Sequence, residues 1–198
     1  MPSEPFAALS ADERRRLIAH ARAAVLTKIG GGGNVGGPDD GAAPESPALA
    51  ALGAAFVTLH VGGELRGCIG TSERRRSLWS VVGDMAGAAA TRDPRFPPID
   101  EADLPDMTVE ISVLSRDTVI HRPEEIVIGR HGLDVRRAGA RGLLLPQVAV
   151  EHHLDRERFL AATCRKAGLA ADAWQDDATE VRVFEAEVFG DEPAAPHD

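Results

Sequence analysis

The six residues Leu65-Arg66-Gly67-Cys68-Ile69-Gly70 hold the side chain best suited to chemistry in this chain, a thiol flanked by glycines and an arginine. A thiolate is nucleophilic and binds metals, and a neighbouring guanidinium favours it over the neutral thiol. Alternate side chains of a strand share a face, so a strand here would put Arg66 beside Cys68. Gly67 and Gly70 would let a ligand approach the backbone closely. The motif leaves two interpretations open, a reactive thiol and a small apolar core cysteine, and the second is the more common for such residue types.

A proline-rich loop is the second candidate for a ligand site. The segment Asp93-Pro94-Arg95-Phe96-Pro97-Pro98 has three prolines that stiffen the backbone. Such a loop would hold Asp93, Arg95 and Phe96 in set positions, where they could contact a ligand.

Glu110 and His131 are the candidate bases. Glu110 alternates with apolar residues in a predicted strand over 107–113, which places it on a solvent or cleft face. A lone carboxylate is more often simply exposed. His131 precedes a glycine and is either a turn residue or an imidazole that lines a cleft. It could activate Cys68 only if the fold brings the two side chains together.

No metal or cofactor is predicted from the sequence. Adjacent histidines on a helix diverge by about 100°, so the run Glu151-His152-His153 cannot easily share one ion. The glycine run Gly31–Gly36 matches a dinucleotide fingerprint by accident, because it follows a predicted helix where the fingerprint needs a strand. The signatures of serine hydrolases, phosphate loops and paired-cysteine zinc sites do not occur.

Composition indicates a soluble globular protein. The net charge of -9 and the isoelectric point near 5.3 argue against a general nucleic-acid binder. The sequence has no apolar run of about 18 residues and no export signal at its start, so we expect a cytoplasmic protein without membrane contact. Cys68 and Cys164 lie far apart in the chain, which in a reducing compartment favours free thiols over a disulfide.

The elements around the thiol are predicted from local patterns. Ser10 and Glu13 form a capping box that opens an amphipathic helix over 11–28. A glycine- and proline-rich stretch over 30–47 predicts a flexible loop. Strands over 55–60 and 64–69 flank a Gly-Gly pair, which is a strong hairpin signal.

The hairpin leaves two registers open for the thiol. A two-residue turn would pair Leu59 with Arg66 and Val57 with Cys68, on a partly buried face. A loop one residue longer would turn Cys68 toward Phe56, Thr58 and His60 instead. The sequence alone does not choose between these registers.

Further patterns complete an α+β fold. They predict a helix over 77–91, a hairpin joining 133–136 to 142–145, a short helix after Pro146, a helix from Asp155 to Gly168 with Cys164 in the core, and a strand over 180–189. Residues 1–11 and 191–198 are expected to be frayed.

Several motifs in fixed order resemble the AMMECR-type domain family, whose bacterial members are called AmmeMemoRadiSam system protein A. The resemblance covers residues 12–190, as a single domain with two subdomains, and rests on Leu65–Thr71, Asp93–Pro98, Val109–Ser115, Gly129–Leu133, Gly142–Gln147 and Cys164–Leu169. It implies a larger subdomain with a mostly antiparallel sheet and flanking helices, a smaller subdomain, and a cleft between them. It also implies Memo-like and radical-SAM partner proteins, and it carries no established reaction.

Two hypotheses follow for function. In the first, the protein is an enzyme in which Cys68 is a nucleophile or thiol carrier, Arg66 favours the thiolate, and Glu110 or His131 assists as base. In the second, the Leu65–Gly70 strand and the Asp93–Pro98 loop form a rigid surface that binds a partner protein or small ligand without catalysis.

Overall fold

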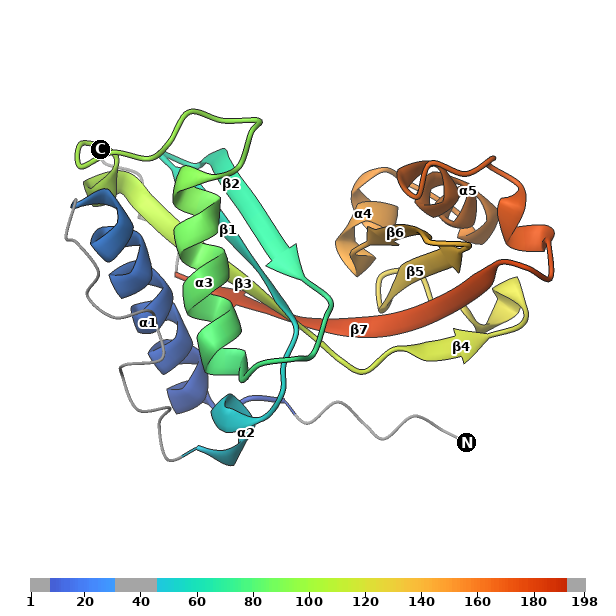
Figure 1. Ribbon diagram of the computed structural model, residues 1–198, viewed down its shortest axis with the longest axis horizontal. Coiled ribbons are helices and arrows are strands. Elements are labelled where there is room, and N and C mark those ends of the chain that lie inside the picture. Colours follow the sequence, from blue (N-terminus) through green and yellow to red (C-terminus); the bar gives the residue numbers. More distant parts are fainter. Residues whose placement is uncertain (1–7, 31–45, 192–198) are drawn as a thin grey trace. The chain divides into compact units, whose positions relative to one another are not determined.

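The computed structural model describes residues 8–30 and 46–191, and it is a mixed α+β protein, as predicted (Figure 1). Its main elements are α1 Ala11–Ile29, α2 Pro47–Ala50, β1 Ala55–Val61, β2 Glu64–Thr71, α3 Leu78–Thr91, β3 Met107–Leu114, β4 Thr118–Ile120, β5 His131–Arg137, β6 Ala140–Leu144, α4 Pro146–Glu151, α5 Arg156–Lys166 and β7 Glu180–Gly190. Short 3-10 turns are η1 Leu104–Asp106, η2 Pro123–Glu125 and η3 Ala173–Gln175. The predicted fingerprint match at Gly31–Gly36, and most of the predicted 30–47 loop, lie outside the described residues.

The chain forms two compact units. The larger unit contains Ala8–Val113 and residues 187–191, and the smaller unit contains Leu114–Ala186. Across the described ranges, no helix has the length and apolar character that crossing a membrane requires.

In the larger unit, α1 begins at the predicted capping box. The Ser10 backbone N–H donates to Glu13 Oε2 at 2.8 Å, and the Glu13 N–H donates back to Ser10 Oγ at 3.2 Å. These two bonds satisfy N–H groups that the first helical turn leaves without partners. Leu17, Ala21 and Val25 recur at helical spacing and are fully buried. Local sequence therefore both starts this helix and selects its inner face.

The sheet of the larger unit has the strand order β2-β1-β3-β7, with β2 at the edge. Helices α1 and α3 lie on one face of β1, β2 and β3 (Figure 1). Side chains alternate across these strands: Val57, Leu59, Val109 and Ile111 are almost completely buried on the helix side. The opposite face, which we call the open face, carries Thr58 and Glu110, both half-buried.

Small residues let α3 approach the sheet. Six of its buried residues are glycine or alanine, namely Gly83, Ala86, Gly87, Ala88, Ala89 and Ala90. Because these side chains are short, the helix backbone comes close to β2, and this contact constrains the thiol motif directly.

In the smaller unit, β7 pairs with both β4 and β5, and β6 pairs with β5, all antiparallel. The predicted hairpin is present, with Arg137 paired to Ala140 across a two-residue turn at Ala138 and Gly139. Both turn residues have positive φ, as this tight turn requires. Helix α5 starts at the predicted cap Asp155, and its Cys164 is completely buried.

Two residues inside the predicted frayed ends are instead held in the larger unit. The Leu9 N–H donates to Glu187 Oε2 at 3.0 Å, and Leu9 is buried. Asp191 accepts hydrogen bonds from Arg22 and from the Val109 N–H. The prediction of fraying failed here because these bonds join residues that are far apart in the chain.

Candidate functional site

Cys68 lies on the open face because β2 contains a bulge. Val61 pairs with Glu64 and His60 with Leu65, so the hairpin turn has the two residues that the Gly-Gly signal predicted. The next pair is Leu59 with Gly67, which leaves Arg66 as an extra residue. A bulge of this kind shifts the pairing of all later residues by one position.

The bulge decides between the two predicted registers. The pairing of Val57 with Cys68 and of Leu59 with Arg66 was wrong, because it assumed an uninterrupted ladder. Cys68 pairs with Thr58 instead, so the thiol has the orientation predicted for a longer loop, although the loop is not longer.

The thiol has a hydroxyl partner and a nearby cation. Thr58 Oγ1 donates to Cys68 Sγ at 3.3 Å, and Cys68 is half-buried. The pKa of the Arg95 guanidinium is raised, chiefly by its hydrogen bond with Asp93 and further by the Cys68 thiol. Among the described residues, no carboxylate or imidazole forms a hydrogen bond with the thiol.

The Asp93–Pro98 loop holds the backbone of Cys68. The Cys68 N–H donates to Asp93 Oδ2 at 2.9 Å, and Arg95 Nη2 donates to the Cys68 carbonyl at 3.3 Å. Arg95 also donates to both oxygens of Asp93, at 3.0 and 2.7 Å. These hydrogen bonds hold the pKa of the buried Asp93 carboxyl well below its usual range, with the Arg95 side chain as the largest cause. The loop thus covers polar backbone groups of an edge strand.

Arg95 itself is partly free for other contacts. Its side chain remains 56% exposed, and its guanidinium carbon lies 5.2 Å from the centre of the Phe96 ring. Arg95 and Phe96, both predicted to contact a ligand, therefore lie together beside the thiol strand. Asp93 is buried, and its carboxylate accepts hydrogen bonds from the Arg95 side chain.

Arg66 has a different partner from the one predicted. Its Nη1 and Nη2 atoms donate to the two oxygens of Asp103, both at 3.0 Å. A bidentate pair of this kind fixes the guanidinium in one orientation. The cation that interacts with the thiol is therefore that of Arg95. Arg66 instead links the bulge in β2 to Asp103, the residue that precedes η1.

Glu110 shares the open face with Cys68 but lies two strands away. Thr58 pairs with Cys68 on one side and with Glu110 on the other, so the three residues form one row across β2, β1 and β3. Neighbouring strands are about 4.8 Å apart, which separates the outer two backbones by roughly 10 Å. Direct proton transfer between Glu110 and Cys68 therefore needs an intermediary, such as the Thr58 hydroxyl or a bound molecule.

His131 lies in the smaller unit, at the start of β5. Its Nδ1 atom accepts a hydrogen bond from the Val127 N–H at 3.2 Å. Burial, followed by the charge of Arg130, lowers the pKa of the imidazole. The predicted pairing with Cys68 stays a prediction.

Gly67 and Gly70 were predicted to let a ligand approach the backbone, but the structure shows that packing also requires glycine at both positions. A Cβ at Gly67 would lie 2.2 Å from the Ala89 carbonyl oxygen of α3. A Cβ at Gly70 would lie 2.2 Å from Cγ of Phe56, which therefore covers this glycine on the open face. Both positions need glycine even without a ligand.

Within residues 8–30 and 46–191, no three His, Cys, Asp or Glu side chains lie so that they could hold one ion together. Cys164 is enclosed in the core of the smaller unit, and burial raises the pKa of its thiol.

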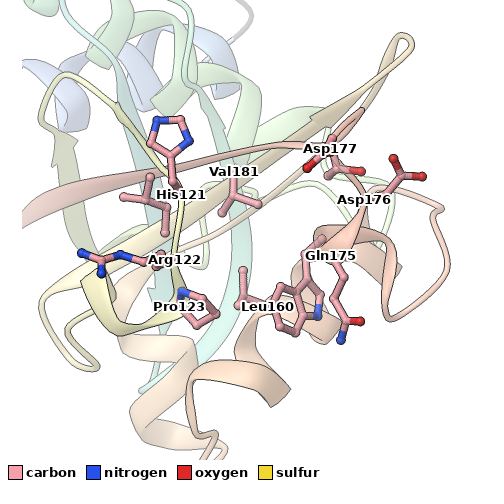
Figure 2. Close-up of a pocket in the computed structure, with 11 residues that line it drawn as sticks. His121, Arg122, Pro123, Leu160, Gln175, Asp176, Asp177 and Val181 are labelled. Carbon is pink, nitrogen blue, oxygen red and sulfur yellow. The ribbon is translucent and has the colours of Figure 1, made fainter.

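A cavity of about 380 Å³ lies in the smaller unit, and no predicted site residue lines it. Its lining residues are Ile120, His121, Arg122, Pro123, Leu160, Trp174, Gln175, Asp176, Asp177, Thr179 and Val181 (Figure 2). The sequence offered little signal for it, because its lining comes from three separate places in the chain, at 120–123, 160 and 174–181, whose residue types are common in other settings.

Comparison with known proteins places the chain in a family. The AMMECR1 family model matches residues 18–189. A protein of Methanothermobacter thermautotrophicus is 43% identical over 93% of this chain and 97% of its own, and one of Methanosarcina acetivorans is 40% identical over 91% and 92%. The crystal structure of an uncharacterized protein from Pyrococcus horikoshii, 37% identical, covers 95% of this chain and 96% of its own with a TM-score of 0.83. These relatives are archaeal, and the bacterial origin that the resemblance suggested stays a prediction. The chain belongs to the AMMECR1 family.

Proposed function

We propose that the protein is a cysteine-centred enzyme whose site is the open face around Cys68. The observation that carries this proposal is the setting of the thiol: half-buried, hydrogen-bonded to the Thr58 hydroxyl, and next to the Arg95 guanidinium. A hydroxyl donor and a positive charge both favour a thiolate over a thiol. Cys68 is then the nucleophile or thiol carrier.

The roles of the neighbouring residues follow from their positions. Arg95 replaces Arg66 as the residue that favours the thiolate, and its exposed edge can also bind an anionic group of a substrate. Glu110, at the far end of the row through Thr58, contacts the part of the substrate most distant from the sulfur. Phe56, which lies over Gly70, supplies an apolar surface beside the thiol.

A binding module without catalysis is the second candidate. It is favoured by the lack of a hydrogen-bonded base at the thiol within the described residues, and by the use of Asp93 and Arg95 to hold the Cys68 backbone. In this case the residues of the motif fix the path of the β2 backbone. The open face then binds a ligand or a partner protein through its shape and its polar groups.

Alkylation of Cys68 distinguishes the two candidates. In a Cys164→Ser background, we expect iodoacetamide to label Cys68 of the folded protein at pH 7 at least as fast as an unstructured cysteine peptide. Arg95→Gln should slow this labelling, and Arg95→Lys should restore much of the rate. Arg66→Gln is the matched control, since its guanidinium binds Asp103 instead, and it should leave the labelling rate unchanged.

The contrary result is also informative. Labelling that occurs only on unfolding, with wild-type and Arg95→Gln proteins alike, would mean a structural cysteine and would leave the binding module as the function. Circular dichroism of each variant must show a folded protein, because Arg95 also supports Asp93.

We propose further that this site acts in the cytoplasm together with a Memo-like protein and a radical-SAM enzyme. Family resemblance alone supports these partners. Mixing the purified proteins encoded by the same genome, followed by size-exclusion chromatography, tests for a complex. Separate elution at micromolar concentration, with and without reductant, would count against direct partnership.

A further inference from the structure

We infer that the cavity of the smaller unit binds a small organic amine with an apolar body. This inference does not depend on the Cys68 site, because every lining residue belongs to the smaller unit. The cavity volume of about 380 Å³ lies at the lower end of the range of roughly 300–1,000 Å³ for ligand sites, so the ligand is small.

The floor of the cavity is apolar and well supported. Leu160 of α5 and Val181 of β7 belong to the buried core of this unit, and Trp174 packs against the same core. Figure 2 shows Leu160 and Val181 between the two polar walls. A ligand body that is aliphatic or aromatic therefore finds apolar contacts on the inner side, and Trp174 offers an aromatic side chain.

Each wall is held in place by its own hydrogen bonds. On one side, the backbone N–H groups of His121 and Arg122 donate to Glu125 Oε1 at 3.0 and 2.9 Å. On the other side, the Thr179 N–H donates to the Asp176 carbonyl at 2.8 Å. Both walls are thus formed before any ligand arrives, which lowers the cost of binding.

Charge favours a cation over an anion. Asp176 is paired with Arg137 at 2.7 Å, whereas Asp177 makes no hydrogen bond or ion pair with any residue in the described ranges. Figure 2 shows the Arg122 side chain pointing away from Leu160 and Val181. An ammonium group near Asp177 gains an opposite charge, and Trp174 can add a cation–π contact.

A buried hydroxyl provides a second, independent sign of a polar ligand group. Thr179 lines the cavity and is 8% exposed, and its Oγ1 atom is buried without a hydrogen-bond partner among the described residues. An unsatisfied buried hydroxyl is costly, because it has given up water without replacement. An amine N–H would satisfy this oxygen once the Thr179 side chain turns its hydroxyl toward the cavity, because the atom has almost no accessible surface in its present orientation.

Titration with matched probes tests the inference in the full-length chain. Trp79→Phe leaves Trp174 as the sole tryptophan, so its indole N–H gives one resolved signal in a 15N-correlation NMR spectrum. At pH 7, we expect 2-phenylethylamine to shift this signal saturably, and phenylacetate, its anionic analogue, to bind at least about tenfold more weakly. Benzyl alcohol, which is neutral, should fall between them.

Three variants locate the site. Asp177→Asn and Thr179→Val should each weaken amine binding several-fold, while Asp172→Asn, an exposed aspartate outside the lining, should not change it. Thr179→Val should also keep or raise the melting temperature, since it removes an unpartnered hydroxyl.

Two results would overturn the inference. The first is a Trp174 signal that none of the three probes moves up to its solubility limit. The second is phenylacetate binding as tightly as the amine, with Asp177→Asn having no effect. Neither result bears on Cys68, so failure here is distinguishable from failure of the proposed enzyme site.

Discussion

Asp93 does more for the thiol site than its loop position suggested. Its side chain is 3% exposed, yet it accepts hydrogen bonds from the Cys68 N–H and from Arg95. A buried charge persists only when it is paired and hydrogen-bonded, and Asp93 meets both conditions. The residue therefore positions both the thiol strand and the cation beside it.

Replacement of Asp93 by asparagine tests this role. Asn keeps the size of the side chain but removes the charge, so we expect Asp93→Asn to lower the free energy of unfolding at pH 7 by about 1–3 kcal/mol. Chemical denaturation of the variant and the wild type measures the difference. Asp100→Asn, at an exposed position nearby, serves as the control.

The lowered pKa of Asp93 also predicts a pH dependence. A carboxyl whose pKa is lower in the folded than in the unfolded protein stabilises the fold above its unfolded pKa, which is about 3.9. This contribution is lost as the pH falls from about 4 toward the folded pKa. We expect the stability gap between wild type and Asp93→Asn to shrink over that interval. A gap that stays constant from pH 6 to pH 2.5 would show that the charge contributes nothing.

At the scale of elements, the contact between β2 and α3 decides where the thiol points. The bulge at Arg66 turns Cys68 to the open face, and Gly67 then faces the helix. The sheet and helix approach so closely there that any side chain at residue 67 meets the backbone of α3.

Glycine substitutions in the hairpin separate packing from turn geometry. Gly67→Ala puts a Cβ against the Ala89 carbonyl oxygen, so we expect a loss of at least about 1–3 kcal/mol in unfolding free energy. Gly62→Asn should be neutral, because Gly62 has φ of +57°, nothing lies near its Cβ, and Asn tolerates this conformation. Thermal denaturation of both variants gives the comparison. Equal melting temperatures would contradict the close contact.

At the scale of the whole molecule, the larger unit is made from both ends of the chain. Glu187 binds the Leu9 N–H and pairs with Arg14 at 2.5 Å, and Asp191 pairs with Arg22 at 2.7 Å. Strand β7 runs from the smaller unit into the larger one. The larger unit is therefore complete only when the last strand has been added.

Each unit contains one tryptophan, which allows this arrangement to be tested. Trp174→Phe leaves Trp79 to report on the larger unit, and Trp79→Phe leaves Trp174 to report on the smaller one. We expect Asp191→Asn to lower the free energy of unfolding that the Trp79 fluorescence reports by about 1–3 kcal/mol, because Arg22 and the Val109 N–H lose a charged partner. The Trp174 signal should shift less. Identical shifts would mean that the units unfold as one.

The sequence by itself determined the features that depend on neighbouring residues. The capping box at Ser10, the buried positions of α1, the turn at Gly62 and Gly63, and the buried Cys164 all follow from local propensity and periodicity. Family membership followed as well, because its motifs are short and occur in a fixed order.

Only the tertiary structure decided which side chains meet. The partner of Arg66 lies 37 positions along the chain and the carboxylate under Cys68 lies 25 positions along it, so neither could be read from spacing. A single extra residue in β2 reversed the face of the thiol. The cavity arose where β4 and β7, which are far apart in the chain, pair beside Leu160 of α5. Such contacts depend on strand register and on the path of loops. Both are set by packing between distant segments of the chain and not by any one stretch of sequence.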